Sequence, residues 1–159
     1  MSELNSFDLK ECLTNSIANV FDTMLSMNVE FDGTCEECTT GNRIVGTVGF
    51  AGKVMGCINL HIGNRFAEII TASMLGMEIE EIESDEDIYD VIGELSNMIG
   101  GDLKSRLCDA DLECQLSIPS TTAGSNFKIE SKGWIKQERI AFISGEEKAL
   151  AEVFIKISD

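Results

Sequence analysis

The stretch IVGTVGF at Ile44–Phe50, with VMGCINL at Val54–Leu60 after it, decides the fold that this sequence predicts. These two apolar runs flank Ala51–Lys53, a short connection that contains a glycine. Two strand-like runs joined by a short glycine-containing connection are typical of a β-hairpin. We therefore expect an antiparallel sheet at the centre of the chain.

The segments before and after this hairpin have apolar residues at helical spacing. The spacing predicts three helices, over Asp8–Met27, Asn64–Leu75 and Ser84–Cys108. We expect Asn64 to cap the second helix, with Gly76 just past its end. Ser84 and Asp87 form a capping-box-like pair that should begin the third helix.

The C-terminal third of the chain is predicted to be rich in strands. Its candidate strands are Leu112–Ile118, Phe127–Trp134, Arg139–Ser144 and Leu150–Ile157. Helices followed by antiparallel strands predict an α+β fold, a two-layer domain with helices packed on a mainly antiparallel sheet. The 159 residues contain one proline and no linker-like tract, so we expect a single domain over residues 1–159.

The charge of the chain narrows the classes of partner. Twelve basic and 28 acidic residues give a formal net charge of −16. Nucleic acid and anionic membranes would be repelled, and neither is expected as a partner. Seven of the ten residues in Glu78–Asp87 are acidic, which is typical of a solvated connection leading into a helix. No signal peptide or membrane span is visible in the pattern, so we expect a cytoplasmic protein with reduced thiols.

Metal binding is weakly indicated. Cys35 and Cys38 have the spacing of a zinc knuckle, but no second pair of ligands completes a site. His61 is the single histidine and ends a strand pattern, where packing is the expected role. We therefore predict no metal site, and an incidental loop around the two cysteines.

The Ser84–Cys108 helix has two distinct faces. Placed at about 100° per residue, its apolar residues cluster on one side: Val91, Ile92, Leu95, Ile99 and Leu103. A stripe of polar and small residues lies opposite: Asp90, Glu94, Asn97, Gly101 and Lys104. Glu94 and Asn97 should therefore face solvent one turn apart. Exposed Glu and Asn residues at this spacing occur on many helices, so spacing alone does not identify a site.

A longer motif is more specific. DVIGELSNMIGGDLK at Asp90–Lys104 is followed by LSIP, ending at Pro119. This string strongly resembles the signature of the CheC/CheX/FliY phosphatases of bacterial chemotaxis, and the chain is most similar to the CheX branch. The resemblance covers nearly the whole chain, and it implies a CheC/CheX-like internal pseudo-repeat. Asn19–Leu25 and Asn97–Leu103 would be the corresponding segments.

The resemblance implies a function and roles for the stripe. The target would be a CheY-like response regulator phosphorylated on an aspartate. Asn97 would hold the attacking water, and Glu94 would pair with the lysine of the regulator's active site. Asp90, Gly101 and Lys104 would contact the partner. The chain would need no cofactor of its own, because Mg²⁺ would be bound in the regulator.

The first helix departs from the two-site members of this family. Asn19 is present, but Ser16 stands where the glutamate would be. The resemblance therefore implies one site per chain and a homodimer. Two alternatives stay open: a non-catalytic module that binds a response regulator, like a flagellar-switch protein, and a small-molecule-binding or structural dimer. Neither the particular regulator nor its output, motility or another, is predicted.

Overall fold

The computed structural model describes residues 4, 6–33, 38, 41–134 and 136–158. Its principal helices are α2 (Leu9–Leu25), α4 (Asn64–Leu75) and α5 (Asp85–Asp109), with a short 3-10 helix η1 (Ile79–Glu81). The strands are β1 (Glu30–Phe31), β2 (Arg43–Gly52), β3 (Val54–Gly63), β4 (Cys114–Leu116), β5 (Ser120–Gly124), β6 (Lys136–Ser144) and β7 (Glu147–Ile157).

The strands form one antiparallel sheet in the order β1-β6-β7-β3-β2-β4, and β5 also pairs with β2. The predicted hairpin is confirmed, because β2 and β3 pair from Arg43 opposite Gly63 to Phe50 opposite Gly56. The free edge of β2 is shared: β5 pairs with its first half and β4 with its end. The sheet is therefore bounded by β1 on one side and by β4 and β5 on the other.

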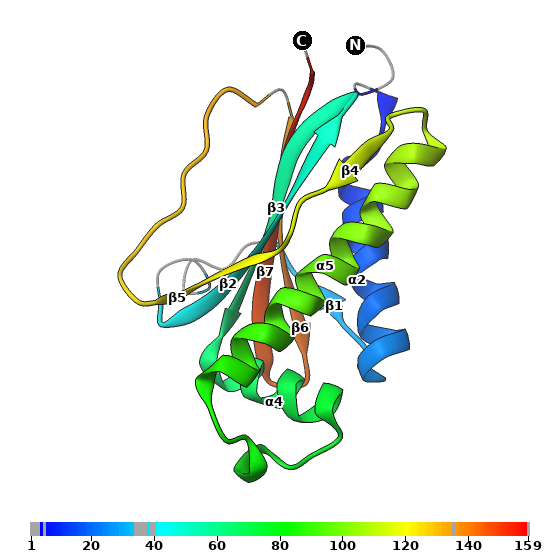
Figure 1. Ribbon diagram of the computed structural model, residues 1–159. Helices are drawn as coiled ribbons and strands as arrows, with labels where there is room; N and C mark the ends of the chain where they lie inside the picture. The colour runs from blue at the N-terminus through cyan, green and yellow to red at the C-terminus, as the bar shows by residue number, and fades with distance from the viewer. Residues whose placement is uncertain (1–3, 5, 34–37, 39–40, 135, 159) are drawn as a thin grey trace.

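Helices α2, α4 and α5 pack on one face of this sheet (Figure 1), which confirms the α+β two-layer prediction. Alternate residues of the strands point toward the helices, as the period of two requires. Ile44 and Val48 of β2 and Ile58 of β3 are buried and belong to the same apolar core as the inner face of α5. The apolar residues predicted for that face, Val91, Ile92, Leu95, Ile99 and Leu103, are all buried.

The helix ends correct two predictions. Asn64 is the first helical residue of α4, and Gly63 takes the cap position without a side chain to bond the helix. Ser84 does cap α5, but its side chain makes no capping hydrogen bond, so the predicted pair with Asp87 does not form. Acidic residues in the first turn of α5 still favour the positive end of the helix dipole. Gly76 ends α4 with a positive φ of 66°, as expected.

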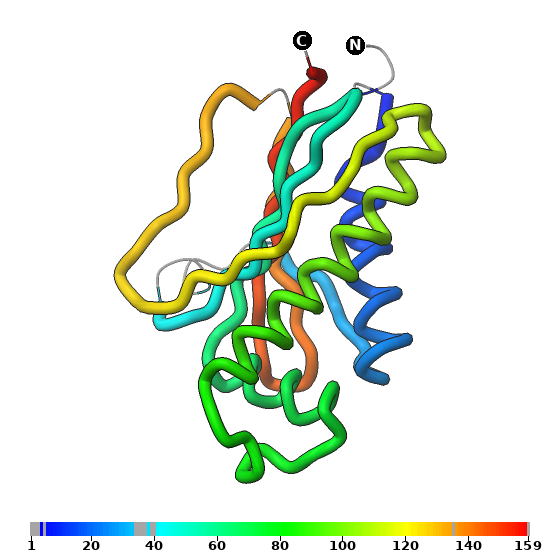
Figure 2. Tube along the Cα trace, in the orientation of Figure 1, coloured from blue at the N-terminus to red at the C-terminus, as the bar shows by residue number. Residues whose placement is uncertain are grey.

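The prediction of a strand over Phe127–Trp134 is wrong. This segment has no regular secondary structure and arches across the sheet face that the helices leave free (Figure 2). The Arg43 guanidinium stacks on the ring of Phe127, with its Cζ atom 4.0 Å from the ring centroid. The ring of Trp134 packs near that of Phe154. Alternating apolar residues thus mark a segment whose side chains pack toward a sheet face, and not a strand within the sheet.

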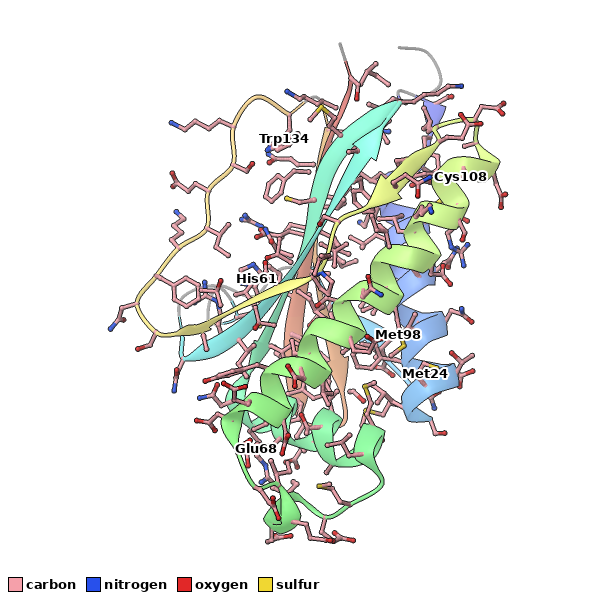
Figure 3. The ribbon with its side chains drawn as sticks, viewed as in Figure 1. Met24, His61, Glu68, Met98, Cys108 and Trp134 are labelled. Atoms are coloured by element: carbon pink, nitrogen blue, oxygen red, sulfur yellow. The ribbon has the colours of Figure 1, made fainter. Side chains whose placement is uncertain are left out.

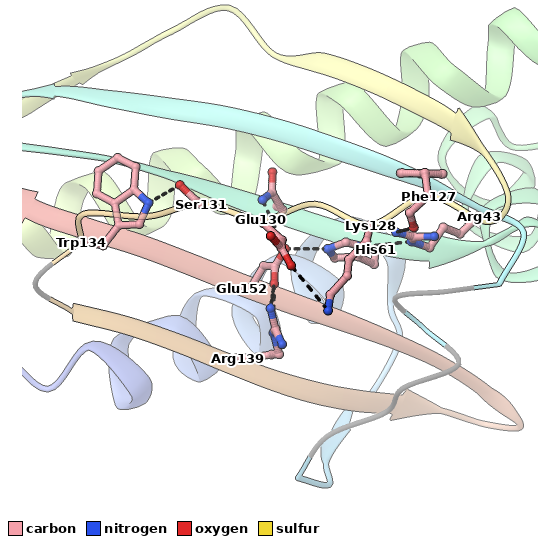
Figure 4. Close-up of polar contacts among 10 residues, drawn as sticks. Arg43, His61, Phe127, Lys128, Glu130, Ser131, Trp134, Arg139 and Glu152 are labelled. Atoms are coloured by element: carbon pink, nitrogen blue, oxygen red, sulfur yellow. Dashed lines mark hydrogen bonds and ion pairs between the residues drawn. The ribbon is translucent and has the colours of Figure 1, made fainter.

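A buried polar network lies beneath this segment (Figure 4). Arg43 donates from Nε to Nδ1 of His61 at 3.0 Å, and Nε2 of His61 meets Glu152 at 2.8 Å. Since Arg43 can only donate, Nδ1 of His61 accepts and Nε2 carries the proton. Arg139 contributes two further bonds to Glu152, at 2.9 and 2.7 Å. Burial raises the pKa of Glu152, but the bonds from His61 and Arg139 lower it by more, so its pKa lies below the usual value.

Helix α5 approaches β2 very closely at Gly46. A Cβ atom at Gly46 would lie 2.0 Å from Oγ of Ser96 and 3.2 Å from the carbonyl oxygen of Ile92. The Ser96 hydroxyl donates to that same carbonyl at 2.8 Å, so it is satisfied within the helix. Gly46 is therefore required by the packing of α5 on the sheet, and not by its own backbone angles.

Gly46→Ala is expected to destabilise the fold, because the added methyl overlaps Ser96. Overpacking of this kind costs roughly 1–3 kcal/mol. Chemical denaturation should show the loss, and the double variant Gly46→Ala/Ser96→Gly should recover part of it by removing the clashing side chain. If Gly46→Ala matches the wild type in stability, the close approach does not set the position of α5.

Candidate active site

The predicted stripe lies on the side of α5 that the core does not bury, and its last two residues, Gly101 and Lys104, lie beside β4. Asp90 and Glu94 are exposed, whereas Asn97, Gly101 and Lys104 are half-buried. The 25-residue helix is held by its buried face along most of its length. It therefore acts as a rigid rod that presents Glu94 and Asn97 one turn apart.

Glu94 and Asn97 make no side-chain hydrogen bond or ion pair within the part of the chain that the structure describes. Most polar side chains in the interior of this protein are, by contrast, engaged; no buried polar side-chain atom lacks a partner among the described residues. A carboxylate and a carboxamide that point outward from a fixed helix, without internal partners, are available to another molecule. This availability is the chemical feature that the spacing alone did not establish.

The chain returns beside α5 after the helix ends. A Cβ atom added at Gly93 would lie 3.6 Å from Cγ2 of Thr121. One added at Gly101 would lie 3.9 Å from Cδ1 of Leu116. The 3.9 Å separation is ordinary contact, so the protein's own packing does not require glycine at 101. Helix propensity disfavours glycine there by roughly 1 kcal/mol. The packing of the described residues therefore does not explain the glycine at 101.

Lys104 and Asp90 lie at the two ends of the stripe. The Lys104 ammonium donates to Oε1 of Gln115 on the strand side at 3.3 Å, which places the charge beside β4. Asp90 has no side-chain partner in the described residues and extends into solvent. The stripe is thus acidic at its start, basic at its end and neutral at Asn97.

The corresponding residues of α2 are arranged differently. Ser16 is fully buried, and its hydroxyl donates to Oδ1 of Asp102 on α5 at 2.8 Å. Asn19 donates to the other oxygen of Asp102, also at 2.8 Å, and Arg106 bonds the same carboxylate at 2.7 Å. Burial raises the pKa of Asp102, but these three donors lower it by more, so the carboxylate stays ionised. Ser16 and Asn19 are therefore committed to holding α2 against α5.

Figure 3 shows Met24 on α2 and Met98 on α5 where the two helices lie side by side. Met98 is half-buried and follows Asn97 directly, whereas Met24 is 50% exposed. The α2 side of the stripe is thus apolar at this point, while Asp102 supplies the polar contact further along.

The acidic segment before α5 has the predicted solvated character. Its acidic side chains are exposed or half-buried, and a capping box joins Glu78 and Glu81 around η1. A cavity of about 490 Å³ opens between this segment, α4 and β5, with Glu68 and Tyr89 among its lining residues. The cavity adjoins the first turns of α5, and neither Glu94 nor Asn97 lines it.

The metal prediction is only partly addressed by the structure. Cys35 lies outside the described residues, so its pairing with Cys38 is not tested. Among the residues that are described, no cluster of three or more metal-binding side chains occurs. His61 is 2% exposed and engaged by Arg43 and Glu152, which confirms a packing role. Burial raises the pKa of the Cys57 and Cys114 thiols, as expected for cysteines that act as small apolar residues.

Two features of this region escaped the sequence analysis. Asp102, the partner of Ser16 and Asn19, lies more than 80 residues from them, and no local pattern connects the three. Ile118, in the returning chain, is 90% exposed. Its place just before Pro119 was visible in the motif, but its exposure was not. No helix in the described part of the chain is long and apolar enough to cross a membrane.

Comparisons with known proteins show the family of this chain. The model of the family described as chemotaxis phosphatase CheX matches residues 44–144, which include all of α5 and its returning chain. A Thermotoga maritima protein named CheY-P phosphatase CheX is 30% identical over 107 residues, covering 67% of this chain and 68% of that protein.

Solved structures share the fold. CheX from Vibrio vulnificus has a TM-score of 0.80 and 21% identity, over 94% of this chain and 97% of that one. A Borrelia burgdorferi CheX, solved as a complex with CheY, BeF₃ and Mg²⁺, has a TM-score of 0.74 and 19% identity over 94% and 98% of the two chains. This chain belongs to the chemotaxis phosphatase CheX family, as the match of the family model and the Thermotoga relative show.

Proposed function

We propose that this protein dephosphorylates the phosphoaspartate of a CheY-like response regulator, in the cytoplasm. Membership of the CheX family supports this function, as does the activity in the name of the Thermotoga relative, CheY-P phosphatase CheX. The observation that carries the assignment of residues is the pair Glu94 and Asn97. Both project from the outer face of α5 without an internal partner among the described residues.

Asn97 would position the water that attacks phosphorus. A carboxamide can accept a hydrogen bond from water and donate one, and it adds no negative charge beside a phosphoryl group. Phosphoryl transfer depends on positioning and charge stabilisation more than on a strong base. The water oxygen bonds to phosphorus as the phosphorus–oxygen bond to aspartate breaks. Inorganic phosphate leaves, and the regulator recovers its carboxylate.

Glu94 would set the docking register. A carboxylate one turn from Asn97 would be repelled by phosphate, but a lysine in the regulator's active site neutralises it and forms a charge-assisted bond. Asp90, Gly101 and Lys104 would contact the regulator around this pair. The regulator would supply the phosphoaspartate and bind the Mg²⁺, so this chain would need no cofactor of its own.

Asn97→Ala is expected to abolish stimulated dephosphorylation, because the water loses its anchor. The fold should be unaffected, since a half-buried polar residue without internal partners contributes little to stability. Phosphate release from a phosphorylated response regulator, with thermal unfolding as a control, measures both. Activity within two-fold of the wild type would refute the water-positioning role. If Asn97→Ala still binds the regulator but no longer stimulates dephosphorylation, the protein is a phosphatase and not a module that only binds.

Glu94→Ala should weaken both binding and turnover, and Glu94→Lys should weaken them further by opposing the regulator's lysine. Affinity for the regulator activated with beryllofluoride isolates the binding effect from chemistry. Asp90→Ala, one turn earlier on the same exposed face, is a matched control that should have the smaller effect. Normal binding by Glu94→Lys would contradict the proposed ion pair.

The first motif is expected to be structural, so Asn19→Ala should retain phosphatase activity. Loss of its bond to Asp102 should cost on the order of 1 kcal/mol at neutral pH. The Asp102 pKa is lowered in the folded state, so stability from this contact is present above the unfolded pKa and is lost as pH falls through the folded pKa. Denaturation at neutral and acidic pH should show the gap between variant and wild type closing. An Asn19→Ala variant as inactive as Asn97→Ala would place a second site on α2.

We further propose a homodimer with one working site per chain. With the α2 motif committed to Asp102, one half of the pseudo-repeat carries the available pair. Exposed strand edges favour pairing with a second chain, and two-fold symmetry is the commonest way to close such an interface. Light scattering should give about twice the 17.4 kDa chain mass. A monomer at micromolar concentration would contradict this assembly.

A further inference from the structure

Ile118 is the most exposed of the large apolar side chains that stand out on the described surface. It is 90% exposed, against 50% for Met24, 46% for Leu75 and 41% for Met55. A single exposed apolar residue needs no explanation by itself. Ile118 requires an explanation because it lies in the chain that runs beside α5 and because the backbone on both sides of it is fixed by hydrogen bonds.

The first observation is its position beside Asn97. A Cβ at Gly93 would contact Thr121, and one at Gly101 would contact Leu116. Asn97 lies one turn from each glycine, so the stretch between Leu116 and Thr121 passes alongside it. Figure 1 shows this returning chain following α5 from β4 to β5. Ile118 lies within that stretch, and its side chain is 90% exposed.

The second observation is that the backbone on both sides of Ile118 is anchored. Ser117 donates from its backbone N–H to the carbonyl of Gly49 at 2.9 Å, and its hydroxyl accepts from the N–H of Gly49 at 2.8 Å. The same hydroxyl bonds the carbonyl oxygen of Ile118 at 3.3 Å. Pairing with β2 resumes at Ser120, opposite Thr47. Ile118 therefore sits at a short break between two fixed points of one strand edge.

Proline at 119 strengthens this arrangement. A residue that precedes proline is restricted to extended backbone conformations, and proline itself offers no N–H for pairing. The break between β4 and β5 thus has few conformations available. An exposed apolar side chain at such a break, in the stretch that passes alongside Asn97, has the properties of a contact residue.

We propose that Ile118 is an apolar docking residue, buried by the receiver domain of the phosphorylated response regulator when Asn97 enters its active site. The inference rests on the proposed function and names a further part of the same surface. A domain that surrounds the Asn97 side chain must also cover the neighbouring returning chain. A second copy of this protein seated on Ile118 would obstruct that approach, so the regulator is the occupant. Burial of Ile118 also keeps bulk water from the edge of the site.

Ile118→Ser tests this role, with Ile118→Val as the conservative variant. Loss of a buried isoleucine contact should weaken association on the order of tenfold. We therefore expect Ile118→Ser to raise both the KM for phosphorylated regulator and the Kd for beryllofluoride-activated regulator about tenfold, with kcat within two-fold of the wild type. Ile118→Val should stay close to the wild type. Met55→Ser, at an exposed position of β3, is the matched control and should change neither constant.

The outcomes separate this inference from the proposed function. If the wild type hydrolyses the phosphoaspartate and Ile118→Ser keeps KM and Kd within two-fold, the docking role is refuted while the function stands. If the wild type binds activated regulator without hydrolysing it, the phosphatase proposal fails, and the Kd of Ile118→Ser still decides the docking role. A fall in kcat at unchanged KM, no binding of regulator by the wild type, or loss of self-association in Ile118→Ser by light scattering would each overturn the inference.

Discussion

The close contact between α5 and β2 is the constraint on which the site depends. At Gly46 the strand has no side chain, and Ser96 of the helix occupies the space that a Cβ would need. One turn further along, a Cβ at Gly100 would lie 3.2 Å from Val48, so the helix stays close to the strand there too. This contact sets the depth at which α5 lies on the sheet. It therefore also sets how far Glu94 and Asn97 project, because both leave the opposite side of the same rigid helix.

The two faces of the sheet are packed differently, one by an apolar core and the other around a polar network. The helical face carries the main apolar core, in which α5 is buried along one side. The other face holds the network of Arg43, His61 and Glu152, covered by the segment that contains Phe127. A buried charge that loses its partner is costly, so this network ties the covering segment to one position through the Arg43 bond to the Phe127 carbonyl. The edge where β2 meets β4 and β5 lies between these two packed faces, and Ile118 emerges at that edge.

Local periodicity predicted what depends on one element at a time. It placed Leu95 inside and Glu94 outside because a helix repeats every 3.6 residues, and it identified the β2–β3 hairpin from strand runs beside a short connection. It failed at Phe127–Trp134 because apolar residues alternate wherever one side of an extended segment is buried, whether or not that segment pairs as a strand. It could not identify the bonds from Ser16 and Asn19 to Asp102, which join parts of the chain that meet only after folding. The roles of Glu94 and Asn97 came from resemblance to a family, since their spacing is common on helices.

The contrast between α2 and α5 shows what makes an asparagine available for chemistry. Asn19 and Asn97 lie at the positions that the family resemblance pairs. Asn19 is exposed on α2 and Asn97 is half-buried on α5, and both helices cover the same face of the sheet. Asn19 meets a carboxylate that needs donors, since Asp102 is partly buried and ionised, and its amide is bonded within the protein. Asn97 has glycines one turn away on either side, and its amide makes no hydrogen bond with the described residues. Its hydrogen-bonding capacity is therefore available to a molecule that comes from outside, and the surroundings of each asparagine, more than its type, decide whether its amide is engaged within the protein.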